Sequence, residues 1–141
     1  MPEYTNVAVQ TVAANQNVLF TSTPVGCNTG NVIHREGSGI ATLRGVTNQC
    51  RARYRVSFVG NIAVPTGGTA GAISVSLAIN GEPLPASTAI VTPAAVEEYF
   101  NVSLDTFVDV PRGCCVTVAV RNTTATPINV QNANMIITRE A

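Results

Sequence analysis

Residues 53–62 read RYRVSFVGNI, and this stretch decides the fold class. Tyr54, Val56, Phe58 and Ile62 fall on one face of an extended chain, while the residues between them are mostly polar. An alternation with a period of two is typical of a strand that buries only one face. The stretch therefore predicts a half-buried β-strand.

Segments on both sides of this strand also favour β-structure. Asn80-Gly81 predicts a tight hairpin, because both central residues of a type I′ turn need a positive φ. The composition of residues 65–71 indicates a loop, and the prolines of residues 82–85 suit an edge strand. Further strands are expected at residues 17–21, 32–35, 40–43, 73–79, 98–110, 114–121, 128–130 and 134–139.

The whole chain predicts one all-β domain of about eight to ten antiparallel strands, a sandwich or barrel. No stripe of apolar residues with a period of 3.6 indicates a helix. No linker or break in composition divides the 141 residues. We expect a single domain over residues 17–141, preceded by residues 1–16 as an N-terminal arm or first strand that could serve for attachment.

The surface is poor in charge. Charged residues make up 11% of the chain, every basic residue is Arg, and the formal net charge is zero. About 25% is typical of soluble domains. Either much of the surface lies against other subunits, or the composition is simply biased. No basic field would attract phosphates, so we expect no nucleic-acid partner.

The sequence predicts neither a membrane protein nor Sec export. No apolar run approaches the roughly 20 residues that span a bilayer. Residues 1–6, MPEYTN, lack the charged and apolar regions of a signal peptide. We expect the chain to stay in the cytoplasm or to leave it as part of a larger particle, with reduced thiols.

The chain contains four cysteines: Cys27, Cys50, Cys114 and Cys115. They allow three pairings, and the sequence leaves the choice open. The vicinal pair would point to opposite faces of a strand, so one of the two is expected to be a small core residue. Without a Cys-x-x-Cys motif, we expect no zinc site.

No constellation of residues predicts an enzyme. His34 is the only histidine, and a dyad with Cys27 is the most visible catalytic candidate, but no nucleophile elbow accompanies it. Glu97-Glu98 is interpreted as a solvated loop. Asp105 and Asp109 are too far apart on one strand to share a calcium ion alone. We expect no catalytic residue, no metal and no cofactor.

Four segments resemble one known superfamily. They are GIATLR (39–44), RYRVSF (53–58), VSLAING (75–81) and FVDVPRGCCVTV (107–118). Their order, from about Val18 to the end, resembles the trimeric jelly rolls of the tumour-necrosis-factor and complement-C1q type, in particular the bacterial and phage members. Two positions depart from the family pattern. Arg51-Ala52-Arg53 replaces the glycine before the aromatic residue, and the late Gly-Asp is Gly113-Cys114.

The resemblance implies a homotrimer. A face that carries Tyr99 and Phe107, opposite to the buried set Phe100, Val102, Leu104, Val108 and Val110, is a candidate trimer interface. Alternatively, the strand bends near Asp105 and one aromatic residue rejoins the core. Arg53 and Arg55 form a cationic stripe that either pairs with Asp105 or Asp109, on a neighbouring strand or subunit, or is an ordinary solvated face.

The expected function is that of a non-enzymatic structural protein. The resemblance favours a trimeric surface component of a virion, such as a phage capsid decoration or head-fibre-like protein. The alternative is a receptor- or carbohydrate-binding trimer, with surface glycans as partners, at a fibre tip or on a bacterial spore or cell surface. A collagen-like or coiled-coil stalk would favour that alternative, and neither occurs in the sequence.

Overall fold

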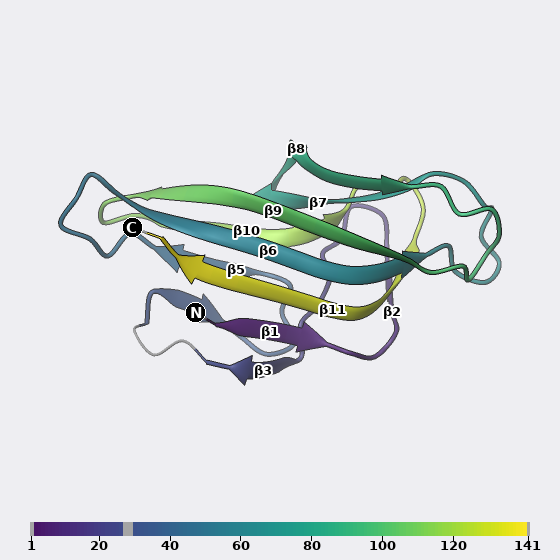
Figure 1. Ribbon diagram of the computed structural model, residues 1–141, viewed down its shortest axis with the longest axis horizontal. Coiled ribbons are helices and arrows are strands. Elements are labelled where there is room, and N and C mark those ends of the chain that lie inside the picture. Colours follow the sequence, from purple (N-terminus) through teal and green to yellow (C-terminus); the bar gives the residue numbers. More distant parts are fainter. Residues whose placement is uncertain (1, 27–29, 141) are drawn as a thin grey trace.

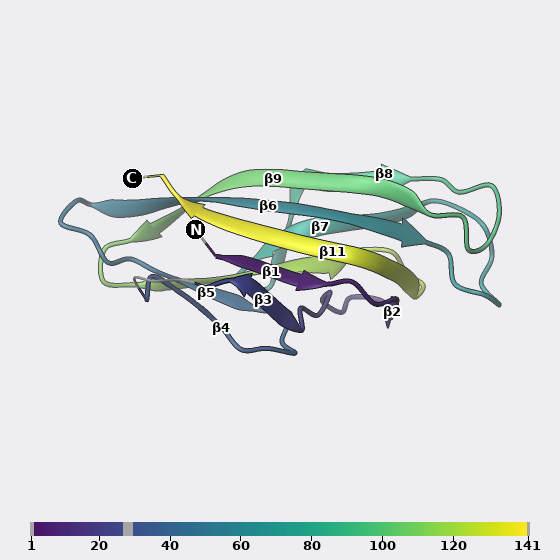
Figure 2. The same ribbon diagram turned by 60° about the horizontal axis from the view of Figure 1, so that its bottom comes forward.

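The computed structural model describes residues 2–26 and 30–140. These residues form two antiparallel sheets that pack face to face, and Figure 1 and Figure 2 show them from two directions. The described part of the chain contains strands and no helix. The predicted fold class, an all-β jelly-roll sandwich, is confirmed.

The first sheet has the strand order β3-β1-β11-β6-β9, with β2 paired to β11. Its strands are β1 (Glu3–Asn6), β2 (Gln10–Val12), β3 (Ser22–Val25), β6 (Arg51–Ala63), β9 (Phe100–Pro111) and β11 (Ile128–Arg139). The second sheet has the order β4-β5-β10-β7-β8. Its strands are β4 (Val32–His34), β5 (Ala41–Arg44), β7 (Ile73–Ile79), β8 (Glu82–Val91) and β10 (Cys115–Asn122).

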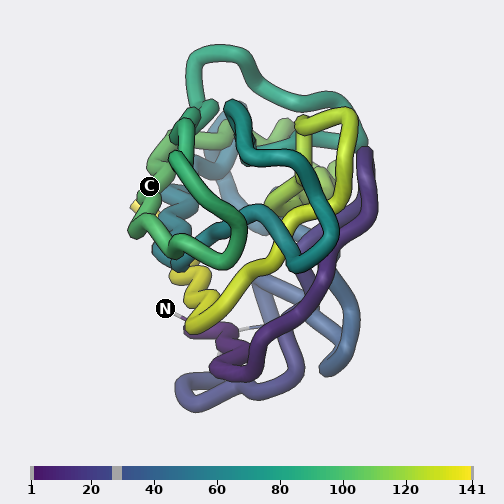
Figure 3. The backbone as a smooth tube through the Cα atoms, turned by 90° about the vertical axis from the view of Figure 1, so that its right-hand side faces the viewer, coloured from purple at the N-terminus to yellow at the C-terminus, as the bar shows by residue number. Residues whose placement is uncertain are grey.

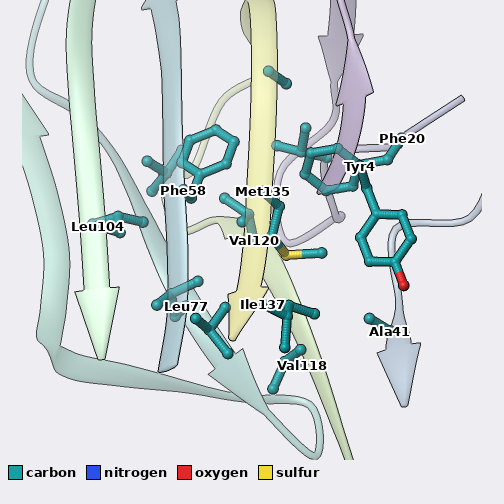
Figure 4. Packing of buried hydrophobic residues seen from close by; sticks show 14 of the residues in the cluster. Tyr4, Phe20, Ala41, Phe58, Leu77, Leu104, Val118, Val120, Met135 and Ile137 are labelled. Carbon is teal, nitrogen blue, oxygen red and sulfur yellow. The ribbon is translucent and has the colours of Figure 1, made fainter. Parts of the chain in front are cut away.

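The core lies between the sheets and is organised by β6. Tyr54, Val56, Phe58 and Ile62 are fully buried, as the alternation predicts. In Figure 4, Phe58 lies near Leu104 and Met135 of the neighbouring strands, with side chains of β7 and β10 in the same cluster. The Tyr54 hydroxyl donates a hydrogen bond of 2.6 Å to the carbonyl of Arg44 on β5, so it links the two sheets.

The β7–β8 hairpin has the predicted turn. Asn80 has a φ of 52° and Gly81 a φ of 86°, and Ile79 pairs with Glu82 across the two-residue loop. β8 is an edge strand that contains Pro83 and Pro85. Proline is tolerated there because its missing N–H breaks no ladder on the open side.

The N-terminal residues belong to the first sheet. β1 pairs with β11 from Glu3↔Ile136 to Asn6↔Ala133, and β2 pairs with β11 from Gln10 to Val12. Tyr4 and Val12 are buried in the core. The Ile137 N–H donates to the Pro2 carbonyl at 3.1 Å, so the first and last described segments lie side by side (Figure 1).

Three expectations about strands need correction. Residues 17–21 form no strand, because their backbone bonds are divided between the sheets: Val18 donates to Val120 of β10, and Thr21 donates to Thr5 of β1. The two expected C-terminal strands are one strand, β11, whose pairing with β6 shifts register between Gln131 and Asn134. Phe100 is 37% exposed because it begins β9, whereas the other four residues of its set are buried.

Asn122 is a fully buried polar residue that joins the two sheets. Its Nδ2 lies 3.1 Å from the carbonyl of Val12 and 3.0 Å from that of Thr126, and its Oδ1 accepts from the Thr124 N–H at 2.9 Å. A buried amide with these partners fixes the end of β10 against the end of β2, because leaving the partners unpaired is costly.

We predict that Asn122→Ala lowers the free energy of unfolding by about 2–4 kcal/mol, since buried carbonyls lose their donor. Urea unfolding of the purified protein measures this. Asn101→Ala is the control, because Asn101 is exposed and its amide donates to the side-chain oxygen of Asn61, at 3.2 Å. It should change stability by less than about 0.5 kcal/mol. Equal effects of the two substitutions would contradict the structural role of Asn122.

The loop after β5 approaches the turn after β9 very closely at Gly45. A Cβ atom added at Gly45 would lie 2.1 Å from the Pro111 carbonyl oxygen and 3.2 Å from that of Cys114. The Gly45 N–H donates to the Cys114 carbonyl at 2.8 Å, and the Gly113 N–H donates to the Gly45 carbonyl at 3.0 Å. Only glycine fits here without displacing backbone.

We predict that Gly45→Ala destabilises the protein by about 2–4 kcal/mol, because the clash is with backbone and cannot be relieved by a side-chain rotation. The thermal midpoint and the urea midpoint should both fall. Gly71→Ala serves as the control, since an added Cβ would meet no atom within 4 Å there. A Gly45→Ala protein as stable as the control would show that the two loops separate freely.

Candidate functional site

The outer side of the first sheet carries a row of alternating charged and apolar side chains on β6 and β9. In the antiparallel register, Arg53 faces Asp109, Arg55 faces Phe107 and Ser57 faces Asp105. We call this surface the β6–β9 outer face. Its members are Arg51, Arg53, Arg55, Val59, Asp105, Phe107 and Asp109.

The charges of this face pair within one chain. Arg53 donates from Nε to Asp109 Oδ1 at 2.7 Å and from Nη2 to Oδ2 at 3.1 Å, a two-pronged contact. Arg55 donates from Nε and Nη2 to the Asp105 carboxylate. Arg51 Nε lies 3.3 Å from Asp109 Oδ2. The expected pairing of the arginines with Asp105 and Asp109 thus occurs between neighbouring strands.

These contacts lower the pKa of both carboxyl groups. Hydrogen bonding from Arg55 is the main reason that the pKa of Asp105 lies below its ordinary value, and the Ser57 hydroxyl, which donates at 3.2 Å, acts in the same direction. Hydrogen bonding from Arg53 likewise lowers the pKa of Asp109. Both carboxylates are therefore ionised at neutral pH, and their charges are balanced locally.

Phe107 is the exposed apolar residue at the centre of the face. Its side chain lies between the two carboxylates on β9, and the residue is 63% exposed. The alternative in which Phe107 turns back into the core does not occur. Tyr99 lies outside β9 and is half-buried. Eight residues at about 3.4 Å each place it about 27 Å from Phe107 along the strand, so the two aromatic residues form no common patch.

Two further apolar side chains lie on this side of the sheet, and sequence reasoning missed them. Val59 of β6 is 45% exposed, and Ile136 of β11, which pairs with Ser57, is half-buried. Val59 follows the same alternation as Arg53 and Arg55 and could have been found from it. Ile136 required the β6–β11 register, which no local pattern reveals.

The catalytic candidate His34 occupies a structural position. Its ring packs against Tyr4, with centroids 4.3 Å apart, and against Phe20 at 6.3 Å. Nε2 lies 2.8 Å from the Ser38 carbonyl, so it donates that bond, and Nδ1 is buried without a hydrogen-bond partner. The dyad partner Cys27 lies outside the described residues.

The remaining candidates are placed as follows. Cys50, Cys114 and Cys115 are free and exposed, so the expectation that one of the vicinal pair is a core residue is wrong. The reason is that Cys114 belongs to the turn and Cys115 only begins β10. Glu97 and Glu98 lie in an exposed loop, as interpreted. Among the described residues, no three His, Cys, Asp or Glu groups are arranged to hold a metal ion.

No helix in the described part of the chain has the length and apolar character to cross a membrane.

Comparisons with known proteins bear on the fold. No family model and no curated protein matches the sequence. Among solved structures, the globular domain of zebrafish complement 1qA protein matches with a TM-score of 0.55 and 10% identity, over 96% of this chain and 94% of that one. The C-terminal domain of EclA, a sugar-binding protein, matches with a TM-score of 0.43 and 18% identity, over 93% and 80%. The first match shows that this jelly-roll sandwich resembles the C1q globular domain in fold.

We predict that Asp105→Asn weakens the fold slightly at pH 7 and hardly at all in strong acid. A carboxyl group whose folded pKa is lowered stabilises the fold above its unfolded pKa, about 3.9, and that stabilisation is lost as the pH falls through the folded pKa. Urea midpoints of wild type and variant, measured from pH 7 to pH 2, should therefore converge. The difference is small because the pair is exposed, and high salt should reduce it. Glu98→Gln, in the exposed loop, is the control, and a gap that persists at pH 2 would contradict the ion pair.

Proposed function

We propose that this protein is a non-enzymatic structural protein that forms a homotrimer through the β6–β9 outer face. In this proposal the trimer sits on the surface of a larger particle, most specifically a phage capsid, as a decoration or head-fibre-like protein. The observation that carries the proposal is the exposure of Phe107 among charges that are already paired within the chain.

The β6–β9 outer face can be buried at low cost. An exposed phenyl ring gains by leaving water, and aromatic residues are enriched at protein interfaces. Unpaired charges oppose burial, but Arg53 and Arg55 bring their own partners with them. With three arginines and two aspartates, the face has a formal charge of only +1. Its charge therefore opposes contact with a neighbouring copy only weakly.

A cyclic trimer needs two different patches, because each copy contacts one neighbour on each side. The first patch is the β6–β9 outer face. The second is expected toward the opposite edge of the same sheet, where Val25 of β3 and Val7, after β1, are exposed. The low overall charge agrees with extensive subunit contacts.

We predict that the wild-type protein has three times the 14.7 kDa chain mass in light scattering, with or without reductant. Phe107→Asp should give a folded monomer, because a carboxylate at the centre of the interface would be buried without a partner. Ile33→Asp is the matched control, since Ile33 is comparably exposed on β4 of the other sheet. A wild-type monomer at micromolar concentration would refute the trimer, and a trimeric Phe107→Asp protein would refute the face.

The location on a particle has its own test. Virions from cultures with and without the gene are compared by electron microscopy and by mass spectrometry of the washed particles. Copies of the chain present in threefold clusters on the capsid support the proposal. Absence of the protein from washed virions, together with its presence on spores or cells, would favour a location on the bacterial spore or cell surface.

A second function, binding of a receptor or an uncharged glycan, is favoured by one groove. This groove, of about 480 Å³, lies at the end of the sandwich seen in Figure 3, and Thr69, Ser74, Thr124 and Ile90 are among its lining residues. Neutral hydroxyl groups there suit a neutral polar ligand, although the Ser74 and Thr123 hydroxyls already bond each other at 2.6 Å. Specific hits of the trimer on a glycan array, abolished by Ile90→Asp, would establish this function.

A further inference from the structure

Three exposed thiols gather at one end of the sandwich. Cys50 ends the loop between β5 and β6, Cys114 ends the turn after β9, and Cys115 begins β10. The Arg112 N–H donates to the Cys50 carbonyl at 3.0 Å, and the Gly45 N–H donates to that of Cys114 at 2.8 Å. Two loops that are distant in sequence therefore form one structural unit, which we call the thiol end.

The exposure of these thiols is unusual. Free cysteine is among the most buried residue types, because its side chain behaves as a small apolar group. Here Cys50, Cys114 and Cys115 are all free and all exposed. None of them contributes to the hydrophobic cluster between the sheets. Packing of the core therefore does not explain why cysteine stands at these three positions. Their exposed thiols are accessible to a reagent from solution.

Each thiol of this end shares a hollow with an arginine. Cys114 and Cys115 line a hollow of about 100 Å³ together with Arg44, Gly45, Val46 and Gly113. Cys50 lines a second hollow, of about 310 Å³, with Gln49 and Arg51. Within residues 2–26 and 30–140, no carboxylate lines either hollow. Arg44 is held in place, because its Nη1 donates to the Gly30 carbonyl at 3.1 Å and its own carbonyl accepts from Tyr54.

We propose that the thiol end is a modification site that takes anionic low-molecular-weight disulfides. The positive charge of an arginine that lines the same hollow attracts a carboxylate of the reagent, and so raises the reagent's concentration near the thiol. Arg44 serves Cys114 and Cys115, and Arg51 serves Cys50. The attraction at Arg51 is weaker, since Asp109 lies 3.3 Å from its Nε. The part of this site at Cys114 and Cys115 is independent of the proposed trimer, because it uses Arg44 and no residue of the β6–β9 outer face. At Cys50 the two surfaces share Arg51.

The reaction is thiol–disulfide exchange. A cysteine thiol loses its proton, and the thiolate sulfur attacks one sulfur of the disulfide. A bond forms between the cysteine and that sulfur, the original disulfide bond breaks, and the other half leaves as a thiolate that takes up the proton. The protein sulfur is oxidised, the reagent is reduced, and the product is a mixed disulfide that carries the reagent's negative charge.

The test compares two disulfides that differ in charge. The first is the dianion 5,5′-dithiobis(2-nitrobenzoate), and the second is the neutral 2,2′-dithiodipyridine. Rates at each cysteine are obtained by site-resolved mass spectrometry and divided by the rates of the same reagents with N-acetylcysteinamide. We expect this normalised rate at Cys114 or Cys115 to be several-fold higher for the dianion than for the neutral reagent. The advantage should shrink as salt is raised from 0.01 to 0.5 M, because screening shortens with ionic strength.

The arginine variants identify the cause. Arg44→Gln should lower the rate of reaction of the dianion at Cys114 and Cys115 about fivefold. This is the factor expected when one attraction between two unit charges, about 4 Å apart in water, is lost. The neutral reagent should react as before. Arg51→Gln should act in the same way, but less, at Cys50. Arg35→Gln is the control, because Arg35 follows β4 at the other end of the β4–β5 hairpin.

Three results would overturn the proposal: no reaction at any thiol of this end, equal normalised rates for the two reagents, or a dianion rate that Arg44→Gln leaves unchanged. A loss of the trimer in the light-scattering experiment would not bear on it. Conversely, unreactive thiols would leave the proposed structural function as it stands.

Discussion

Burial of the inner face of β6 is the interaction on which the rest of the structure depends. Tyr54, Val56, Phe58 and Ile62 lose all contact with water, and they can do so only if a second sheet covers them. Tyr54 also bonds the Arg44 carbonyl of that sheet. Since successive side chains of a strand point to opposite sides, the same constraint turns Arg53, Arg55 and Val59 outward. The core and the candidate interaction face are two sides of one alternation.

Much of this could be predicted from the sequence, because the signal was local. The alternation of β6 and β9, the Asn80-Gly81 hairpin and the polar loop before β7 all depend on neighbours within a few residues. Residues 17–21 show the limit of such reasoning. Val18 and Phe20 alternate correctly and are buried, yet the segment crosses from one sheet to the other and pairs regularly with neither. Whether residues 17–21 form a strand depends on which strands they pair with, and no short sequence pattern specifies that pairing.

The candidate site was predictable to the same degree. The alternation of side chains along the two strands placed the arginines, the aspartates and Phe107 on outward faces. Arg53 and Asp109 are 56 residues apart, and they pair because of the register between β6 and β9. From the sequence alone, Asp109 could have belonged either to a neighbouring strand or to a neighbouring subunit. The thiol end was missed for the same reason. Cys115 pairs opposite Arg44 only because β10 meets β5, and nothing near either residue announces it.

The pairing of β1 with β11 has a consequence for the connectivity of the fold. Because Ile137 bonds Pro2, the two described ends of the chain meet within one sheet, and the backbone almost closes on itself. A short flexible peptide could join them without disturbing a strand. New ends could then be opened in residues 65–71, a loop outside every named strand. The pairing of strands in space, and not the position of a chain break, therefore defines the architecture of this jelly roll.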